Sequence, residues 1–397
     1  MKRERIGNIL QMQRGYDLPS SQMSGGNIPV VGSNGIVGFH DISRCILPTI
    51  TIGRSGSAGK VHYYEEPTWV HNTALYLTDF KGNNPKYLYY LLQLLHLEKL
   101  CGSSVIPSLN RNVVYPMLVN FHEDRHEQDA IANILSLIDK KIALNREINR
   151  NLEAMARQLY DYWFVQFDFP DENGRPYKSS GGKMVWNEKL KRSIPSTWRN
   201  GSLPEIANFS NGIACQKFRP TNESDRLPVI KIREMRDGIT DESEWVRSDI
   251  PESVKVYNGD ILFSWSASLE VMIWCGGKGG LNQHIFKVTP QTNYPKSFIY
   301  YQILDYIEVF KSIAEARKTT MGHITQDHLN QSAIAIPEDN YILQLFNDKI
   351  LPIFQDIVSN NEEINSLTLQ RDELLPLLMN GQVYVMPTAV NCDLSHG

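Results

Sequence analysis

The sequence repeats itself once at a spacing of about 200 residues, and this repeat constrains the fold more than any other feature. Residues 28–31 (IPVV) match 227–230 (LPVI) at an offset of 199. Residues 87–90 (YLYY) match 298–301 (FIYY) at an offset of 211, and 147–149 (EIN) match 363–365 (EIN) at 216. Because the matches keep their order, we predict two copies of one unit, the second longer by 12 and then 5 residues.

Each copy is predicted to begin with a mixed domain of strands and helices. Short β-type runs with turn signals occupy residues 48–64 and 259–274, and a short helical pattern follows at 87–100 and 297–313. Strands followed by helices of this kind indicate an α/β (α+β) domain in each copy.

Each copy is predicted to end in a long helix, at residues 124–165 and 340–380. Apolar residues recur there near a 3.5-residue period, which is typical of a coiled coil, so we predict two long antiparallel helices that pair. Asn145 and Asn361 fall in the seam, where a buried polar pair fixes helix register. Two amphipathic helices on separate cores are the alternative. Pro352 is expected to kink the second helix or leave a short lead-in before it.

The formal net charge of −4 is unevenly distributed along the chain. Residues 1–122 carry a net charge of +4, 123–189 of −2, 190–337 of +1 and 338–397 of −7. The acidic excess is therefore concentrated in the second helix and the tail. A mildly basic domain is weak evidence for DNA binding, and on charge alone a solvated surface is the favoured interpretation.

Composition places the chain among ordinary globular proteins. The five cysteines are scattered and form no CxxC motif, and no run of 18 apolar residues or signal peptide is present. These features favour a cytoplasmic, reduced protein that holds no metal.

The motifs of common catalytic sites are missing from the sequence. The loop at residues 53–60 (GRSGSAGK) has Arg54 where a P-loop needs its first glycine and Val61 where it needs Ser or Thr. A hairpin turn is the better interpretation. Residues 84–87 (NPKY) resemble an amino-methyltransferase tetrad only loosely, no GxGxxG or GxSxG motif occurs, and no histidine has zinc-site spacing. We therefore predict a protein that is not an enzyme.

Two similar domains on a fixed spacer suit a protein that reads two half-sites of a nucleic acid. A helix of about 40 residues spans roughly 60 Å at ~1.5 Å per residue. This corresponds to an upper limit of about 18 base pairs at ~3.4 Å per step.

Several segments resemble one known family. Residues 159–186 (LYDYWFVQFDFPDENGRPYKSSGGKMVW) with 194–198 (IPSTW) resemble the central conserved region and second-domain entry of type I restriction-modification specificity (S) subunits, the HsdS family. Gln128 and Gln344 resemble that family's helix entries, and residues 54–64 its glycine-containing domain motif. The resemblance covers nearly the whole chain. It departs where the first domain lacks the Trp-bearing entry and where Trp265 and Ser266 replace Arg54 and Ser55.

The resemblance implies a domain order and a function. It implies target-recognition domains at 1–122 and 194–337, long helices at 123–165 and 338–383, a linker at 166–193 and a tail at 384–397. Such subunits lack catalysis and cofactors of their own and bind a split, asymmetric sequence in double-stranded DNA. Two methyltransferase subunits, using S-adenosylmethionine, are expected on the helices, and restriction subunits, using ATP and Mg²⁺, join later.

Candidate DNA-contacting residues follow from the chemistry of base and phosphate recognition by Arg, Lys, Asn and Gln on loops. The candidates are Asn34, Arg54 and Lys60 in the first domain and Lys231, Arg233, Arg236, Lys278 and Gln283 in the second. A solvated surface charge is the alternative for each. Two other functions stay open: an adenine methyltransferase fused to its recognition domain, and a coiled-coil assembly protein whose domains bind other proteins.

Overall fold

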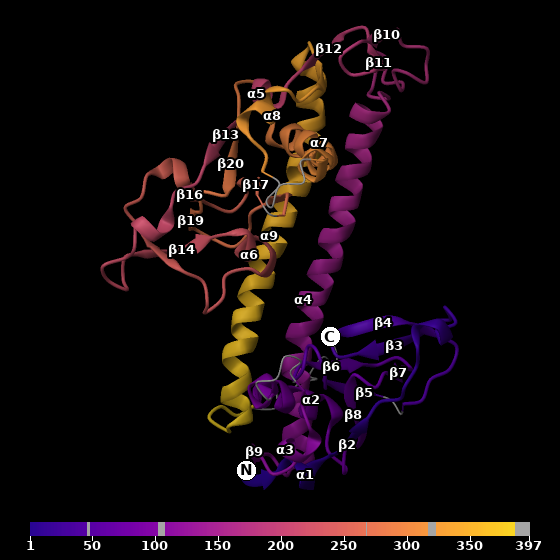
Figure 1. Ribbon diagram of the computed structural model, residues 1–397, viewed down its shortest axis with the longest axis vertical. Coiled ribbons are helices and arrows are strands. Elements are labelled where there is room, and N and C mark those ends of the chain that lie inside the picture. Colours follow the sequence, from indigo (N-terminus) through magenta and orange to yellow (C-terminus); the bar gives the residue numbers. More distant parts are fainter. Residues whose placement is uncertain (46–47, 102–107, 267, 317–322, 386–397) are drawn as a thin grey trace, which may run out of the picture. The chain divides into compact units, whose positions relative to one another are not determined.

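The computed structural model describes residues 1–45, 48–101, 108–266, 268–316 and 323–385 (Figure 1). The chain forms two compact units. Unit 1 consists of Met1–Lys141 and Leu367–Gly397, and unit 2 consists of Ile142–Ser366. The chain passes from one unit into the other only within its two long helices, α4 (Arg125–Tyr160) and α9 (Asn340–Met379).

Besides helix segments, unit 1 contains a group of strands and short helices that we call the first head. Its elements are β1 (Lys2–Arg5), α1 (Ile6–Ile9), β2 (Gln11–Arg14), β3 (Ile28–Gly32), β4 (Gly35–His40), β5 (Thr49–Gly53), β6 (Val61–Tyr64), β7 (Trp69–Val70), β8 (Ala74–Asp79), α2 (Pro85–Leu94), α3 (Arg111–Val114) and β9 (Leu118–Phe121). The strands form sheets of order β2-β8-β5-β6, β4-β3-β7 and β1-β9.

Unit 2 contains the second head, preceded by the hairpin β10 (Met184–Asn187) and β11 (Arg192–Pro195). The elements of the second head are β12 (Trp198–Gly201), α5 (Leu203–Ile206), β13 (Ala207–Asn211), β14 (Arg226–Ile230), α6 (Ile232–Asp237), β15 (Trp245–Arg247), β16 (Lys255–Val256), β17 (Ile261–Ser264), β18 (Glu270–Ile273), β19 (Gly279–Leu281), β20 (Ile285–Pro290), α7 (Lys296–Ala316), α8 (Gln326–Asn330) and β21 (Ile334–Pro337). The strands form sheets of order β13-β20-β17-β18, β15-β14-β19-β16 and β12-β21.

The two heads share one topology, which confirms the predicted duplication. Each sheet of the first head has a counterpart of the same strand order in the second, with β16 added at one edge. Even the parallel register agrees: Val31 pairs with Val70 in the first head, and Ile230 pairs with Leu281 in the second. Residues 33–34 join β3 to β4, whereas 231–244 join β14 to β15. The predicted 12-residue excess therefore lies in this connection, which contains α6.

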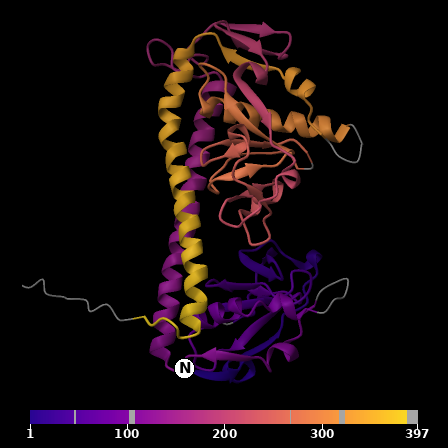
Figure 2. The same ribbon diagram turned by 90° about the vertical axis from the view of Figure 1, so that its left-hand side faces the viewer.

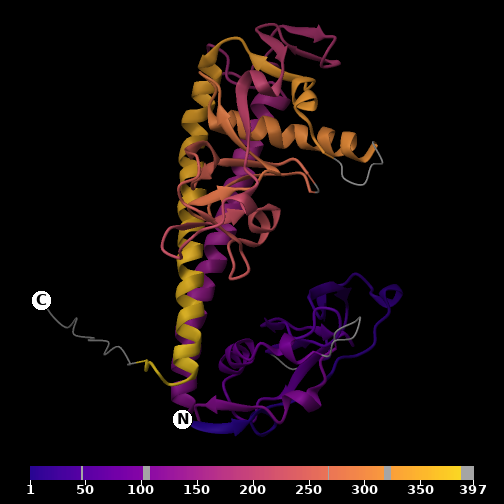
Figure 3. The same cartoon turned by 60° about the vertical axis from the view of Figure 1, so that its left-hand side comes forward.

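Helices α4 and α9 pair in antiparallel orientation within each unit, as predicted. In unit 1, Arg371 donates to Asp139 at 3.0 Å; the two helix segments run beside each other at the lower end of Figure 3. In unit 2, Asn145 donates to Glu363 at 2.7 Å and Asn360 donates to Asn149 at 2.8 Å; these helix segments lie side by side in Figure 2. Residue numbers rise on α4 as they fall on α9, which defines the antiparallel pairing.

Two details of the long helices differ from expectation. Helix α9 is continuous from Asn340 to Met379, so Pro352 does not leave a separate lead-in. Packing holds the helix around Pro352, because Phe346 and Ile350, which precede the proline, are fully buried. Asn145 and Asn361 do not bond to each other. Asn361 instead donates to the Ile357 carbonyl at 2.9 Å and to Cys275 Sγ at 3.6 Å.

An aromatic core fastens both long helices to the second head. Helix α4 passes into a π-helical turn at Asp161–Val165, which buries Trp163 and Phe164. The Phe164 ring lies 4.9 Å from Phe346 of α9, 5.0 Å from Phe298 of α7 and 5.6 Å from Trp198 of β12, measured between ring centroids. The segment that resembles the family's central region thus forms the junction between helices and head.

A buried polar junction fastens α4 to the first head. Gln128 of α4 is almost fully buried and donates to the His122 carbonyl at 2.8 Å, while its side-chain oxygen accepts from the Asn84 amide at 2.8 Å. Asn84 in turn caps α2. Gln344, the counterpart of Gln128 in the repeat, is exposed and donates to Asp348 of its own helix at 2.9 Å. The repeat therefore preserves the residue but not its role.

The helices of the described residues include none that is long and apolar enough to cross a membrane.

Candidate nucleic-acid interface

Three loops of the first head meet around the backbone of Thr73. Arg54 N–H donates to the Thr73 carbonyl at 2.8 Å, and the Ser33 hydroxyl donates to the same oxygen at 2.8 Å. The Ser33 hydroxyl also donates to the Ser55 carbonyl. The β3–β4 turn, the β5–β6 loop and the β7–β8 turn are therefore joined by hydrogen bonds, which fixes the backbone that carries their side chains.

The glycine-containing loop closes a hairpin, as predicted. Strands β5 and β6 pair antiparallel, with Ile52 opposite Val61, and the Gly53 amide donates to the Lys60 carbonyl at 2.7 Å. A Cβ at Gly59 would lie 2.2 Å from the Glu98 backbone nitrogen, and Gly59 has a φ of +91°. Close backbone approach, rather than phosphate binding, explains this glycine.

The candidate residues of the first head share this loop cluster. Lys60 donates to the Asn34 side chain at 2.8 Å, which places the two candidates in contact. Arg54 is half-buried, and its guanidinium has no hydrogen-bond or ion-pair partner among the described residues. The structure thus brings Asn34, Arg54 and Lys60 together on joined loops.

The second head repeats the same loop connections with different side chains. Trp265 N–H donates to the His284 carbonyl at 3.2 Å, as Arg54 does to Thr73, and the Trp265 carbonyl accepts from Ile324, as that of Arg54 does from Leu109. Positions 54 and 265 are therefore structurally equivalent at the offset of 211. The repeat in the sequence already aligns Trp265 with Arg54. The structure shows that both side chains extend from the same position of the backbone.

A pair of glycines missed by the sequence reasoning supports both loop clusters. A Cβ at Gly15 would lie 2.3 Å from the His71 carbonyl oxygen, and one at Gly212 would lie 2.3 Å from that of Asn282. A carbon cannot approach backbone oxygen so closely, so both positions require glycine. The signal available in the sequence was their shared offset, 197 residues, close to the 199 of the neighbouring strands.

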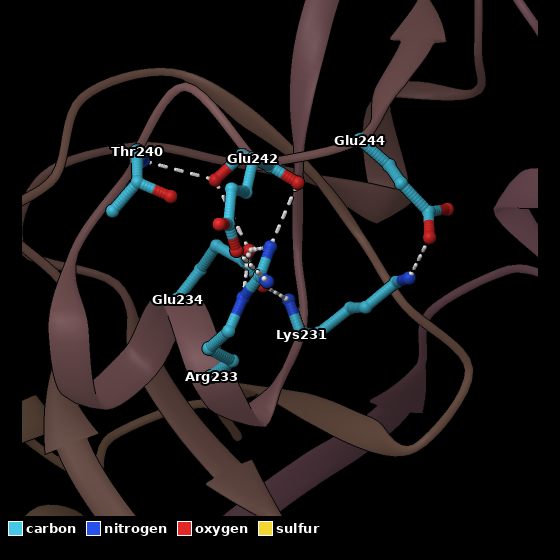
Figure 4. A network of polar contacts seen from close by, with 7 residues as sticks. Lys231, Arg233, Glu234, Thr240, Glu242 and Glu244 are labelled. Atoms are coloured by element: carbon cyan, nitrogen blue, oxygen red, sulfur yellow. Dashed lines mark hydrogen bonds and ion pairs between the residues drawn. The ribbon is translucent and has the colours of Figure 1, made fainter. Parts of the chain in front are cut away.

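Three basic candidates of the second head are engaged by glutamates. Lys231 forms an ion pair with Glu244, and Arg236 forms one with Glu270. Arg233 donates to Glu234 at 2.8 Å and to the Glu242 carbonyl at 2.9 Å (Figure 4). These contacts lie in or beside the 12-residue excess around α6. They favour a structural role for the three cations over free display toward a ligand.

Glu234 is the buried centre of the network in Figure 4, with 1 % of its surface exposed. Burial opposes its ionisation, but hydrogen bonds from Arg233, from Ser243 Oγ at 3.0 Å and from the Lys231 amide at 3.2 Å outweigh it. Together they hold the pKa of Glu234 below its ordinary value of 4.5. The charged form of Glu234 therefore stabilises the α6 connection.

The remaining candidates occupy different surroundings. Lys278 is exposed, with its Nζ 5.9 Å from the centre of the Tyr257 ring. Gln283 lies on the β19–β20 turn beside His284, to whose Nε2 its amide nitrogen lies at 3.4 Å. Gln283 therefore belongs to the loop cluster of Trp265, whereas Lys278 precedes β19. Within the described part of the chain, no group of His, Cys, Asp and Glu could hold a metal ion.

The fold and its joined loops define a duplicated α/β protein with two heads and two long antiparallel helices. A family model described as the type I restriction modification DNA specificity domain matches residues 1–154 and 195–370. The chain therefore belongs to the type I restriction-modification DNA specificity family, as the resemblance predicted.

Known proteins agree with this family assignment. The chain is 24% identical over 314 residues to the type I restriction enzyme MjaIX specificity subunit of Methanocaldococcus jannaschii, covering 76% of this chain and 69% of the relative. It is 23% identical to the HindI specificity subunit of Haemophilus influenzae, covering 71% and 72%. A crystal structure of the type I restriction-modification S subunit from M. genitalium superposes with a TM-score of 0.62, at 16% identity, over 95% of this chain and 96% of that one. This last likeness concerns the fold alone.

Proposed function

We propose that the chain is the non-catalytic, sequence-specific DNA-binding subunit of a type I restriction-modification complex. It recognises a bipartite, asymmetric site in double-stranded DNA, one half-site per head. Methyltransferase and restriction subunits assemble on it and supply S-adenosylmethionine, ATP, Mg²⁺ and the chemistry. The recognition domains are residues 1–122 and 194–337, the helices 123–165 and 338–383, the linker 166–193 and the tail 384–397.

The observation that carries this proposal is the duplicated loop cluster within a family of DNA specificity domains. Both heads join the same loops through the same backbone bonds, but they present different side chains, Arg54 in one and Trp265 in the other. Equivalent frameworks with different side chains suit the recognition of two different half-sites. A protein that read a palindrome would need identical side chains at these positions.

An apolar stripe on α4 supports the docking of partner subunits. In unit 2, Leu144, Ile148 and Met155 follow one another at steps of four and seven residues and are 55 %, 39 % and 59 % exposed. Such spacing places them along one face of the helix, and exposed apolar surface of this extent marks a protein interaction site. We call these three residues the α4 stripe.

A groove next to the α4 stripe extends this surface. It has a volume of about 940 Å³ and lies in unit 2 between the end of α4 and the start of α9. Its lining includes Met155, Leu159 and Tyr162 of the first helix segment and Lys349 and Ile353 of the second. An amphipathic helix of a methyltransferase subunit would bury its apolar face here.

The test is reconstitution with type I methyltransferase subunits from the same host. The purified complex should bind a split DNA sequence and methylate adenine within it, and mapping methylated adenines in the host genome should show one bipartite motif. Loss of that motif on deletion of this chain, with the methyltransferase retained, is the expected result.

The two alternative functions predict other outcomes. Methyl transfer by this chain alone would support a fused methyltransferase. Absence of DNA binding at low salt with all partner subunits present would support a protein-assembly scaffold, because phosphate contacts are strongest there.

A further inference from the structure

The two loop clusters allow the side chains that read each half-site to be compared position by position. Strands β5 and β8 pair in the same register as β17 and β20, with Gly53 opposite Ala74 and Ser264 opposite Ile285. The residue that follows each first strand, Arg54 or Trp265, therefore leaves the same point of the sheet. Differences between these side chains are differences in what each head can recognise.

In the first head this point carries a guanidinium on a fixed backbone. The Arg54 backbone is held on both sides, because its N–H donates to Thr73 and its carbonyl accepts from Leu109, both at 2.8 Å. Its side chain has no hydrogen-bond or ion-pair partner among the described residues. A planar fork of donors on a hydrogen-bonded loop matches the O6 and N7 acceptors of guanine in the major groove.

In the second head the same point carries a neutral ring that is fixed inward. The Trp265 indole N–H donates to Asn211 Oδ1 at 3.0 Å, and the ring centroid lies 5.5 Å from those of His284 and His323. Trp265 thus supports its neighbours instead of presenting a cation.

Polar atoms beside this ring lack partners. Gln283 Oε1, His284 Nδ1 and His323 Nδ1 are shielded from solvent and have no hydrogen-bond partner in the described part of the chain. Buried polar atoms are normally satisfied. Three such atoms, on the two histidines beside the indole and on Gln283 next to His284, therefore point to a polar ligand that completes them. A Gln carboxamide matches the N6 donor and N7 acceptor of adenine.

We propose that Arg54 determines a guanine in the half-site of the first head and that Gln283, supported by Trp265 and His284, determines an adenine in the half-site of the second. This inference rests on the proposed function. It assigns different bases to the loop clusters of the two heads, and it makes Trp265, the counterpart of Arg54, a positioning residue.

The test uses the complete complex with its methyltransferase subunits and a DNA library randomised in both half-sites, with bound molecules sequenced. Arg54→Gln should reduce the preference for guanine at one position by about 5- to 150-fold and favour adenine there, leaving the other half-site unchanged. Gln283→Ala should remove an adenine preference in the other half-site only. Arg14→Gln, in the same head but bonded to Asp17 at 3.0 Å, is the matched control and should change no base.

The outcomes separate this inference from the proposed function. If Arg54→Gln weakens binding equally for all sequences, or changes no base preference, Arg54 contacts phosphate or solvent and the inference is wrong. If the unaltered complex selects no bipartite sequence, the proposed function itself fails.

Discussion

Matched insertions in the two long helices should lengthen the gap between half-sites without changing the half-sites themselves. The chain passes between its units after Lys141 in α4 and after Ser366 in α9. Adding the same four helix-forming residues at both points preserves the antiparallel bonds within each unit, including those of Asn145 to Glu363 and of Asn360 to Asn149.

The size of the effect follows from helix geometry. Four residues at ~1.5 Å rise add about 6 Å, and they turn the helix by about 40° beyond one full turn. At ~3.4 Å per base-pair step this corresponds to one to two additional base pairs in the gap. Four is the best small number, because three or five residues would leave the seam about 60° or more out of phase.

The assay is selection of bound DNA by the reconstituted complex, followed by sequencing, or mapping of methylated adenines in cells. The control inserts the same residues after Asn173, in an exposed turn of unit 2, and should leave the gap unchanged. Insertion in α4 alone should lower the melting temperature, because it takes Asn145 and Asn149 out of register with α9. New half-site bases with an unchanged gap would refute the helix-spacer reasoning.

Three further predictions test the junction, the docking surface and the α6 connection. Phe164→Ala should lower the free energy of unfolding by about 3–5 kcal/mol, because it opens the aromatic core. Tyr162→Ala, at an exposed position, should lower it by less than ~1 kcal/mol. Chemical denaturation measures both values, and equal effects would contradict the role of Phe164 at the junction. Met155→Asp with Ile148→Asp should reduce co-purification of methyltransferase subunits at least tenfold with an unchanged melting temperature, and full retention would exclude the α4 stripe as the docking surface. The pKa of Glu234 is depressed, so the stability that its carboxylate contributes is present above pH 4.5, its ordinary value, and is lost as the pH falls through and below that value. Glu234→Gln should therefore flatten the decline in melting temperature below about pH 4.5. An unchanged decline would contradict the role of Glu234 in the α6 connection.

Much of the fold was predictable because it depends on patterns that are local in the chain. The 3.5-residue period marked both long helices, and the ordered offsets of 199, 211 and 216 revealed the two copies. Even the 12-residue excess was correctly counted, although only the structure places it around α6. Hydrophobic period and residue order are properties of neighbouring residues, so they can be read without knowing the tertiary contacts.

The candidate site was only partly predictable, because the availability of a charge depends on distant partners. Asn34 and Lys60, 26 positions apart, do meet as members of one loop cluster. Arg236, by contrast, is paired with Glu270, which lies 34 positions away. Nothing local distinguishes Arg236 from Arg54, although Arg236 pairs with an acid and Arg54 has no hydrogen-bond or ion-pair partner among the residues that the structure describes.

The sequence by itself determined that this protein has two similar heads and two long helices that pair antiparallel. The tertiary structure decided which side chains each head presents and which polar residues fix the helices. The seam pairs are Asn145 with Glu363 and Asn149 with Asn360, more than 200 residues apart, and not Asn145 with Asn361. The physical reason is that periodicity selects a helix and its buried face, whereas a hydrogen bond requires two atoms about 3 Å apart, a separation that only the folded chain establishes.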